Sequence, residues 1–217
     1  MAELGKVDVR PSGAAGAAQV KPAGVILAAG ASSRMGTPKA LLEFEGETFI
    51  DRWIRLFATV CDPVIVVLGF DAERIRKGTR RSEDVSFVLN PNPARGMLSS
   101  LQTGLRSVAP DIEKTLFTLV DYPKVSAATV SAVAQAFHPA TAPVVIPVYH
   151  GQRGHPVCIG RPLIEEMLRL PDGASPKDVM HRHLGETFFL KADDPGVLAD
   201  IDDPESYAAL LTQEVRR

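Results

Sequence analysis

The chain has 217 residues, and its 24 basic and 26 acidic side chains give a formal net charge of −2. This balance creates no large positive field, so binding to nucleic acid or to an anionic membrane surface is not expected. With 45% hydrophobic residues the chain can bury one sizeable core, while no apolar run approaches the roughly 18 residues of a membrane-spanning helix.

Residues 1–21 combine a charged start with many Gly, Ala and Pro residues and contain no apolar core. A secretory signal needs such a core, so this segment is predicted to be a flexible N-terminal tail. Residues 22–217 are predicted to form one domain. The two cysteines, Cys61 and Cys158, lie far apart and in no C-x-x-C pair, which favours reduced, buried thiols in a cytoplasmic protein.

From Ala23 onward, short apolar segments alternate with segments of helical periodicity. The predicted strands are Gly24–Ala28, Val64–Leu68, Val85–Leu89, Thr115–Val120, Val144–Pro147, Pro156–Ile159 and Thr187–Lys191. The predicted helices are Phe49–Val60, Asp71–Gly78, Leu98–Val108, Ser126–Phe137, Pro162–Leu170, Pro176–Leu184 and Pro204–Thr212. The alternation predicts a three-layer α/β/α sandwich around a mostly parallel mixed sheet.

The segment Pro143–Ile159 interrupts this alternation, because two predicted strands flank the polar stretch YHGQRG. That pattern indicates a hairpin and an antiparallel excursion in the sheet. Elsewhere, the loops that follow the strands are rich in Gly, Ser, Asp or Asn. In open α/β sheets ligands bind beyond the carboxyl ends of the strands, so these loops are expected to carry the functional residues.

The first of these loops lies within LAAGASSRMGTPKALL, residues 27–42. Its small residues would let backbone N–H groups approach an anion closely, and Arg34 and Lys39 could neutralise a triphosphate. The loop is not a Walker A motif, because five residues separate Gly30 from Gly36 and Thr37 follows where that motif has lysine. It also lacks the G-x-G-x-x-G pattern of dinucleotide-binding folds.

The stretch resembles the L-A-(A/G)-G-x-S-x-R-M-G-x-x-K-x-L-L signature of the MobA-like nucleotidyltransferases, above all their molybdenum cofactor cytidylyltransferase branch. Four later stretches are also similar to motifs of that family: NPNPARGMLSSLQTGL from Asn90, LVDYPKV from Leu119, GQRGHPV from Gly151 and DIDDPESY from Asp200. The resemblance covers about residues 23 to 210. It implies a Rossmann-like, GT-A-like fold.

The same resemblance implies a reaction in which CMP passes from CTP to a phosphorylated acceptor with release of pyrophosphate. The acceptor would be molybdopterin or the molybdenum cofactor, and a molybdoenzyme or an insertion chaperone is a further possible partner. A phosphate monoester is largely dianionic at pH 7 and needs no general base. This agrees with a sequence in which no Ser/His/Asp or Cys/His constellation stands out.

The resemblance also implies roles for individual residues. Arg34 and Lys39 would grip the triphosphate, and Arg153 and His155 would face the acceptor. The nucleotide would further contact Leu27, Ala28, Ala29, Gly30, Gly36, Ser99 and Ser100. The Ala28-Ala29-Gly30 run is typical of the cytidylyl branch, whereas the guanylyl branch has Ala-Gly-Gly there.

Magnesium is the cofactor that this chemistry predicts, since Mg²⁺ prefers one or two carboxylates together with phosphate oxygens. Asp121 follows an apolar strand and is the first candidate ligand. Asp202, by its match to a late aspartate of the family, is the second, and Asp200 is its rival.

The match departs from the family pattern on the acceptor side. Tyr122 stands where the family often has Gln or His, and residues 172–180 lack an arginine of the corresponding family segment. An acceptor such as a sugar phosphate or another phosphorylated metabolite therefore stays open. The sequence is also compatible with a nicotinamide-dependent oxidoreductase or a non-catalytic cofactor chaperone on the same fold.

Overall fold

The computed structural model describes residues 21–215, and the predicted tail, residues 1–21, lies almost wholly outside this range. The main sheet has eight strands: β1 (Ala23–Ala28), β4 (Val64–Leu68), β5 (Ser86–Leu89), β6 (Lys114–Leu119), β7 (Val144–Tyr149), β8 (Gln152–Arg153), β9 (Val157–Gly160) and β10 (Thr187–Lys191). The α-helices are α1 (Phe49–Val60), α2 (Ala72–Gly78), α3 (Met97–Arg106), α4 (Ala127–Ala136), α5 (Arg161–Arg169), α6 (Pro176–Arg182) and α7 (Pro204–Val215).

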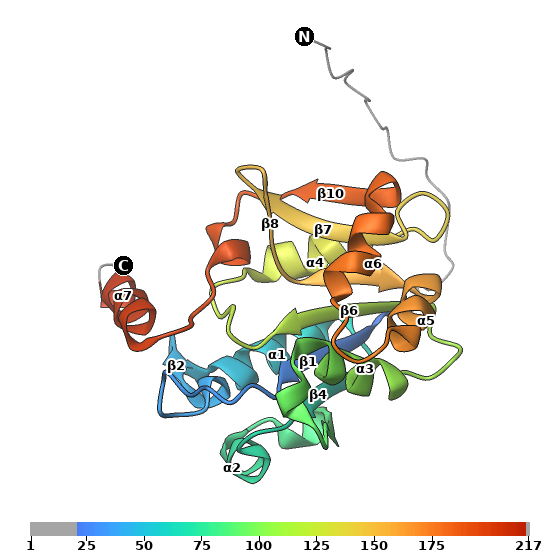
Figure 1. Cartoon of the computed structure of the whole chain (residues 1–217). Coiled ribbons are helices and arrows are strands. Elements are labelled where there is room, and N and C mark those ends of the chain that lie inside the picture. Colours follow the sequence, from blue (N-terminus) through green and yellow to red (C-terminus); the bar gives the residue numbers. More distant parts are fainter. Residues whose placement is uncertain (1–20, 216–217) are drawn as a thin grey trace.

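The strand order is β10-β7-β9-β6-β1-β4-β5, with β8 paired to β7. Neighbouring strands are parallel except where β9 pairs with β6 and β7 and where β8 pairs with β7. Helices α3, α5 and α6 cover one face of the sheet, and α1 and α4 cover the other (Figure 1). The predicted three-layer sandwich with a mostly parallel sheet is therefore confirmed. No helix within residues 21–215 is both long and apolar enough to cross a membrane.

Strand β1 lies at the centre of this arrangement. All six of its residues are buried, because β4 and β6 flank it in parallel and helices cover both faces. Side chains that alternate along the strand go to different layers: Ile26 packs with α1 and α4, and Val25 packs with α3 and α5. The loop that leaves β1 is thus anchored in the rigid middle of the molecule.

Helix α1 follows from its sequence more directly than any other element. Its apolar residues recur at helical spacing, and Trp53, Ile54 and Phe57 are fully buried against the sheet. The Thr48 hydroxyl accepts a hydrogen bond from the Asp51 N–H and so caps the first turn. The predicted bounds of this helix are confirmed at both ends.

The predicted hairpin and antiparallel excursion between Pro143 and Ile159 are confirmed, but the bounds of the strands differ from the prediction. Strand β7 runs on to Tyr149 and turns at His150 and Gly151, both with positive φ, into the two-residue strand β8. Strand β9 then begins at Val157 and pairs with the first part of β7. The tight hairpin is therefore β7–β8. After a break at residues 154–156, β9 pairs with the same edge of β7 as β8 does.

Two further short strands, β2 (Glu43–Phe44) and β3 (Glu47–Thr48), form an antiparallel ribbon that the sequence did not predict, because each is only two residues long. The Tyr207 hydroxyl of α7 donates to the carbonyl oxygen of Glu43 at 3.0 Å. Helix α7 consequently lies beside this ribbon (Figure 1). Both cysteines are buried free thiols, as predicted, and burial raises the pKa of each, that of Cys158 to about 12.

Candidate active site

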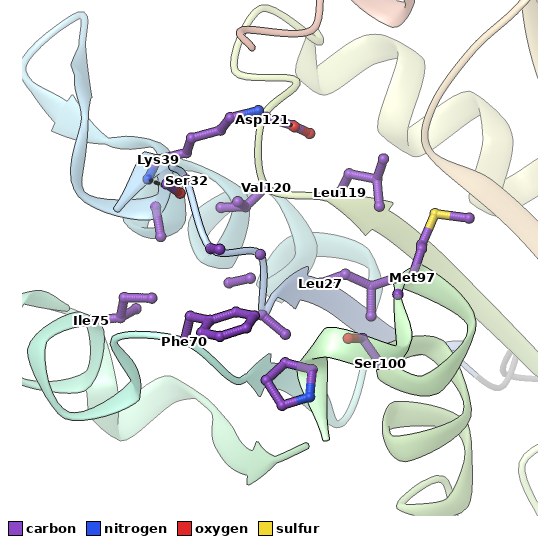
Figure 2. A pocket seen from close by; sticks show the side chains of 17 residues that line it. Leu27, Ser32, Lys39, Phe70, Ile75, Met97, Ser100, Leu119, Val120 and Asp121 are labelled. Atoms are coloured by element: carbon purple, nitrogen blue, oxygen red, sulfur yellow. Dashed lines mark hydrogen bonds and ion pairs between the residues drawn. The ribbon is translucent and has the colours of Figure 1, made fainter. Parts of the chain in front are cut away.

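A cavity of about 290 Å³ opens where the loops after β1 and β4 meet the start of α3. Its lining comprises Leu27, Ala28, Ala29, Gly30, Ala31, Ser32, Lys39, Ala40, Phe70, Ile75, Pro93, Gly96, Met97, Ser100, Leu119, Val120 and Asp121. Figure 2 shows Lys39 and Asp121 at one end and Ser100 at the other, between Phe70 and Met97. The cavity thus has a charged end and a mainly apolar end.

The loop after β1 is shaped to present Lys39. Ser32 has a positive φ of 49°, and its carbonyl oxygen accepts the Met35 N–H at 2.9 Å. The Ser32 hydroxyl accepts the Lys39 N–H at 3.0 Å, which holds the backbone of Lys39 at the start of a short 3₁₀ helix. Gly36, with a φ of 64°, also takes a left-handed conformation that few other residues adopt.

Lys39 joins two carboxylates that lie far apart in the sequence. Its Nζ atom is 3.0 Å from Oδ2 of Asp121 and 2.5 Å from Oδ1 of Asp202. Asp202 also accepts a hydrogen bond from Arg34, whose Nη2 atom is 3.1 Å from Oδ2. The structure therefore brings together four predicted site residues. Lys39 is largely buried, whereas the Arg34 side chain is 64% exposed and contacts only the rim of the site.

The pKa values in this cluster move in opposite directions. Burial alone would lower the pKa of Lys39, but its hydrogen bond to Asp202 and the charge of Asp121 outweigh burial and raise it. The hydrogen bond from Lys39 lowers the pKa of Asp202. Burial raises the pKa of Asp121, and Lys39 offsets only part of that effect. The negative charge of Asp121 is thus less well stabilised than that of Asp202.

One oxygen of Asp121 supports the interpretation of this end as a metal site. Its Oδ1 atom is buried and has no hydrogen-bond partner within residues 21–215. A buried carboxylate oxygen without a partner is costly, and a divalent cation would satisfy it. Among the described residues, no group of three or more His, Cys, Asp or Glu side chains is arranged so that it could hold a metal ion. An ion here would therefore take its remaining ligands from phosphate and water, as Mg²⁺ commonly does.

The three aspartates at the start of α7 have different positions. Asp202 reaches Lys39, whereas Asp203 accepts the Ser206 N–H at 2.8 Å and caps α7. Asp200 is exposed and lies near Tyr122, where its charge is the second cause, after burial, of a Tyr122 pKa of about 12. The geometry thus favours Asp202 over Asp200 as the partner of Asp121.

The opposite end of the cavity separates the predicted serine pair. Ser100 is buried and lines the cavity, whereas Ser99 is not among the lining residues and donates its hydroxyl to the Gly96 carbonyl at 2.9 Å. Asn90, which the sequence did not single out, is 3% exposed and donates to both serine hydroxyls. Two signals in the sequence pointed to it: it follows a predicted strand directly, and it is the first residue of the motif-like stretch NPNPARGMLSSLQTGL.

Ala29 shapes the wall of the cavity. It is buried, and its carbonyl oxygen accepts the Phe70 N–H at 3.3 Å. A Cβ placed on the neighbouring Gly69 would lie 2.7 Å from that oxygen and 2.8 Å from the Ala29 methyl carbon. The loops after β1 and β4 therefore approach each other so closely that only glycine fits at position 69.

The predicted acceptor residues lie outside the cavity lining. The Arg153 guanidinium is 5.1 Å from the ring centre of Phe189 on the edge strand β10. The His155 ring packs against Phe117 and Tyr122, with centroids 6.0 and 4.9 Å away. Burial lowers the pKa of His155 to about 4, so the ring is neutral near pH 7, and its Nδ1 atom has no partner among the described residues.

Comparison with known proteins finds one family and several similar proteins. The family model described as the MobA-like NTP transferase domain matches residues 24–187. The molybdenum cofactor cytidylyltransferase of Escherichia coli K12 is 24% identical over 183 residues, which cover 84% of this chain and 92% of that protein.

Two solved structures are also similar. A nucleotidyl transferase from a Methanothermobacter is 25% identical, with a TM-score of 0.77 over 90% of this chain and 98% of that one. The Rv0371c protein of Mycobacterium tuberculosis H37Rv, solved in complex with manganese, is 25% identical with a TM-score of 0.71 over 89% of this chain and 99% of the other.

Proposed function

Because this chain belongs to the MobA-like NTP transferase family, we propose that it transfers CMP from CTP to the phosphate of a molybdopterin-type acceptor and releases pyrophosphate. The observation that carries the proposal is the position of Lys39. Its ammonium group lies between Asp121 and Asp202 at the charged end of a cavity whose other end is apolar. A nucleotide has the same polarity, with a triphosphate at one end and a flat base at the other.

In the proposed reaction an oxygen of the acceptor phosphate attacks the α-phosphorus of CTP. A new P–O bond forms as the bond to the β-phosphate oxygen breaks, and the electron pair leaves with pyrophosphate. The acceptor dianion has no proton to lose, so alignment and charge compensation are the main requirements. Lys39 would stabilise negative charge that grows on the α-phosphate, and Arg34, being more exposed, would hold the outer phosphates.

Asp121 and Asp202 are the residues that would hold Mg²⁺. When bound, the ion would neutralise phosphate charge and help to align the α-phosphate for in-line attack. Support comes from the unpartnered Oδ1 atom of Asp121 and from the similar mycobacterial protein that was solved with manganese. Lys39 bonds both carboxylates, so in this proposal its ammonium group turns to the phosphates when the nucleotide is bound.

We assign the acceptor side to Tyr122, His155 and Arg153. Tyr122 follows Asp121 directly and is partly exposed, and its ring stacks obliquely on the neutral His155 ring, so Tyr122 offers an aromatic surface next to the charged cluster. Arg153 is exposed on β8 and can reach an anionic group of an incoming molecule. A pterin has a flat ring system and a phosphate, and both features suit this surface.

A pyrophosphate-release assay tests the proposal. CTP, GTP, ATP and UTP are each incubated with the purified protein, Mg²⁺ and one of several acceptors: molybdopterin, the molybdenum cofactor or a set of sugar phosphates. We expect release with CTP and a molybdopterin-type acceptor together, and not with either alone. Release with a sugar phosphate instead would support the nucleotidyl transfer but assign a different acceptor. The unusual Tyr122 is the reason to include these acceptors. No release with any pair would contradict the proposed function.

A further inference from the structure

We propose that Asn90 is a positioning residue that fixes the hydroxyl group of Ser100 as a hydrogen-bond donor toward the nucleotide base, and thereby selects cytosine over uracil. The inference rests on the proposed function in one respect: the apolar end of the cavity has to be the place where the base binds. Otherwise it depends only on a set of short hydrogen bonds around one buried amide.

The orientation of the Asn90 amide follows from its neighbours. The backbone N–H of Asn92 donates to Oδ1 of Asn90 at 2.9 Å, and a backbone N–H can only donate. The Oδ1 atom is therefore on that side, and Nδ2 is on the other. The residue is 3% exposed, and its own N–H donates to the Leu68 carbonyl at 2.8 Å. Asn90 is thus held firmly at the end of β5.

The two protons of the Asn90 Nδ2 atom are both used. They go to the hydroxyl oxygen of Ser99 at 2.8 Å and to that of Ser100 at 3.0 Å. Each serine therefore accepts a hydrogen bond from Asn90 and has one hydroxyl proton left to donate. Ser99 can give its proton to the Gly96 carbonyl at 2.9 Å or to the Asn92 carbonyl at 3.2 Å.

Ser100 differs in this respect. Within residues 21–215, no protein acceptor is found for its hydroxyl proton, although the side chain is buried. The residue lines the cavity between Phe70 and Met97 (Figure 2). A buried hydroxyl proton without a partner is unfavourable, so a bound ligand is expected to supply the acceptor. The hydrogen bond from Asn90 occupies one lone pair of the Ser100 oxygen, and so it favours the arrangement in which Ser100 donates its proton to the ligand.

The chemistry of the bases then gives a preference. Cytosine has two adjacent acceptors, O2 and N3, on one edge of its ring. Uracil carries an N–H at position 3, and guanine carries one at position 1, so each offers a donor where cytosine offers an acceptor. The side chains of Leu27, Phe70 and Met97 at this end provide no strong acceptor for such a donor. A single hydrogen bond of this kind corresponds to about a tenfold difference in affinity.

The variant that tests the idea is Asn90→Asp, because a carboxylate of the same shape can still accept from Asn92. It would also accept from both serines, so the Ser100 proton would turn away from the cavity and leave an oxygen lone pair toward the base. Binding of CTP and of UTP is measured by calorimetry with Mg²⁺ and without acceptor. We expect wild-type protein to prefer CTP, and Asn90→Asp to lose about tenfold in CTP affinity together with most of that preference.

Two further variants keep the test decisive. Ser100→Ala removes the same proton without changing Asn90, so it should lose the same preference even if Asn90→Asp folds poorly. The double variant Asn90→Asp/Ser100→Ala should bind CTP no more weakly than either single variant, because both substitutions remove the same hydrogen bond to the base. The matched control is Thr103→Val on the same helix, whose hydroxyl donates to the Ser99 carbonyl at 2.8 Å and does not line the cavity. It should retain wild-type affinities.

The positioning role also predicts how the kinetics divide. In Asn90→Asp the KM for CTP should rise while kcat at saturating CTP stays close to wild type, because the base lies away from the reacting phosphorus. Unchanged CTP and UTP affinities in a folded Asn90→Asp protein would overturn this inference and leave the proposed reaction intact. A selectivity change in Ser99→Ala and none in Ser100→Ala would overturn it too. A wild-type protein that binds no nucleotide would remove the proposed function itself.

Discussion

The backbone N–H of Ile201 donates a hydrogen bond to the carbonyl oxygen of Asp121 at 2.8 Å. This bond joins the segment before α7 to the end of β6, although the two are far apart in the sequence. The next residue, Asp202, is therefore held where its carboxylate meets the same ammonium group that bonds Asp121. The segment before α7 therefore supplies one of the charged side chains of the site.

Replacing Lys39 with alanine should lower kcat by about 100-fold or more, because its ammonium group is proposed to stabilise charge that develops only in the transition state. Steady-state kinetics with saturating CTP and acceptor measure the effect, and circular dichroism checks that the fold persists. Lys77→Ala, at an exposed position on α2, is the matched control and should keep wild-type turnover. Near-normal kcat in the Lys39 variant would rule out this role.

Asp121→Asn should abolish activity at ordinary Mg²⁺ concentrations, and Asp202→Asn should weaken it. The amide keeps the shape of the side chain but binds a divalent ion poorly. Asp121 is the more buried of the two and is held by the sheet, so its loss should cost more. Direct Mn²⁺ binding and activity across a Mg²⁺ titration separate the two variants.

Asp200→Asn serves as the neighbouring control for these carboxylates. Asp200 is exposed and lies outside the Lys39 cluster, so the variant should bind Mn²⁺ like wild type. If Asp200→Asn is the damaging change and Asp202→Asn is silent, the second ligand has been assigned to the wrong aspartate.

Ala29→Gly should shift nucleotide preference toward GTP. The Ala29 methyl group lies in the cavity wall close to Gly69, and its removal would widen the cavity for a purine. One methyl group corresponds to about 1–3 kcal/mol of discrimination at most, so a change of roughly tenfold in the CTP to GTP ratio is expected. Competition between the two nucleotides in one assay gives this ratio. An unchanged ratio would place base selection elsewhere in the cavity.

The stability of the protein should depend on pH through His155. Its folded-state pKa of about 4 is below the usual 6.5 because the ring is buried. Below pH 6.5 the unfolded chain binds a proton that the folded protein does not, so this contribution to stability is complete above pH 6.5 and is lost as the pH falls toward 4. Urea unfolding gives the free energy of unfolding at pH 7 and at pH 5. The decrease in this free energy from pH 7 to pH 5 should be smaller in His155→Gln than in wild type.

His183 provides a comparison of opposite sign. Its hydrogen bond to Glu166 raises its pKa, so its contribution is present below pH 6.5 and is lost as the pH rises above that value. The variant His183→Gln should therefore lose stability at pH 5 more than at pH 7. If the two histidine variants change the pH dependence in the same direction, the assignment for His155 is wrong.

The sequence predicted the strands and long helices well because their apolar residues repeat with clear periods. Helix α1 is the best example, with an apolar face that fixes both its ends. Strand β6 ends at Leu119 rather than Val120, and α7 extends to Val215, because terminal residues have little periodic signal. The turn within YHGQRG was predicted, but strand β8 was not, because the pattern there does not say which residues pair.

The sequence predicted which residues belong to the candidate site, but it did not predict which of them contact one another. Lys39, Asp121 and Asp202 stood out by motif, but their mutual bonding depends on how the end of the chain returns to the sheet. Asn90 lay in a motif-like stretch but received no role of its own, because an asparagine after a strand usually belongs to a turn. Its function in the site is visible only once its amide is seen to bond Ser100.

The pairing of Arg34 and Lys39 with Asp121 and Asp202 has a consequence for the encounter with substrate. Two positive and two negative groups cancel one another at short range, so this cluster projects little net field into solution. A highly charged nucleotide then gains little electrostatic steering from it, and its rate of association should depend only weakly on ionic strength. The charges of this site act mainly once the nucleotide is bound, when Lys39 exchanges its carboxylate partners for phosphate oxygens.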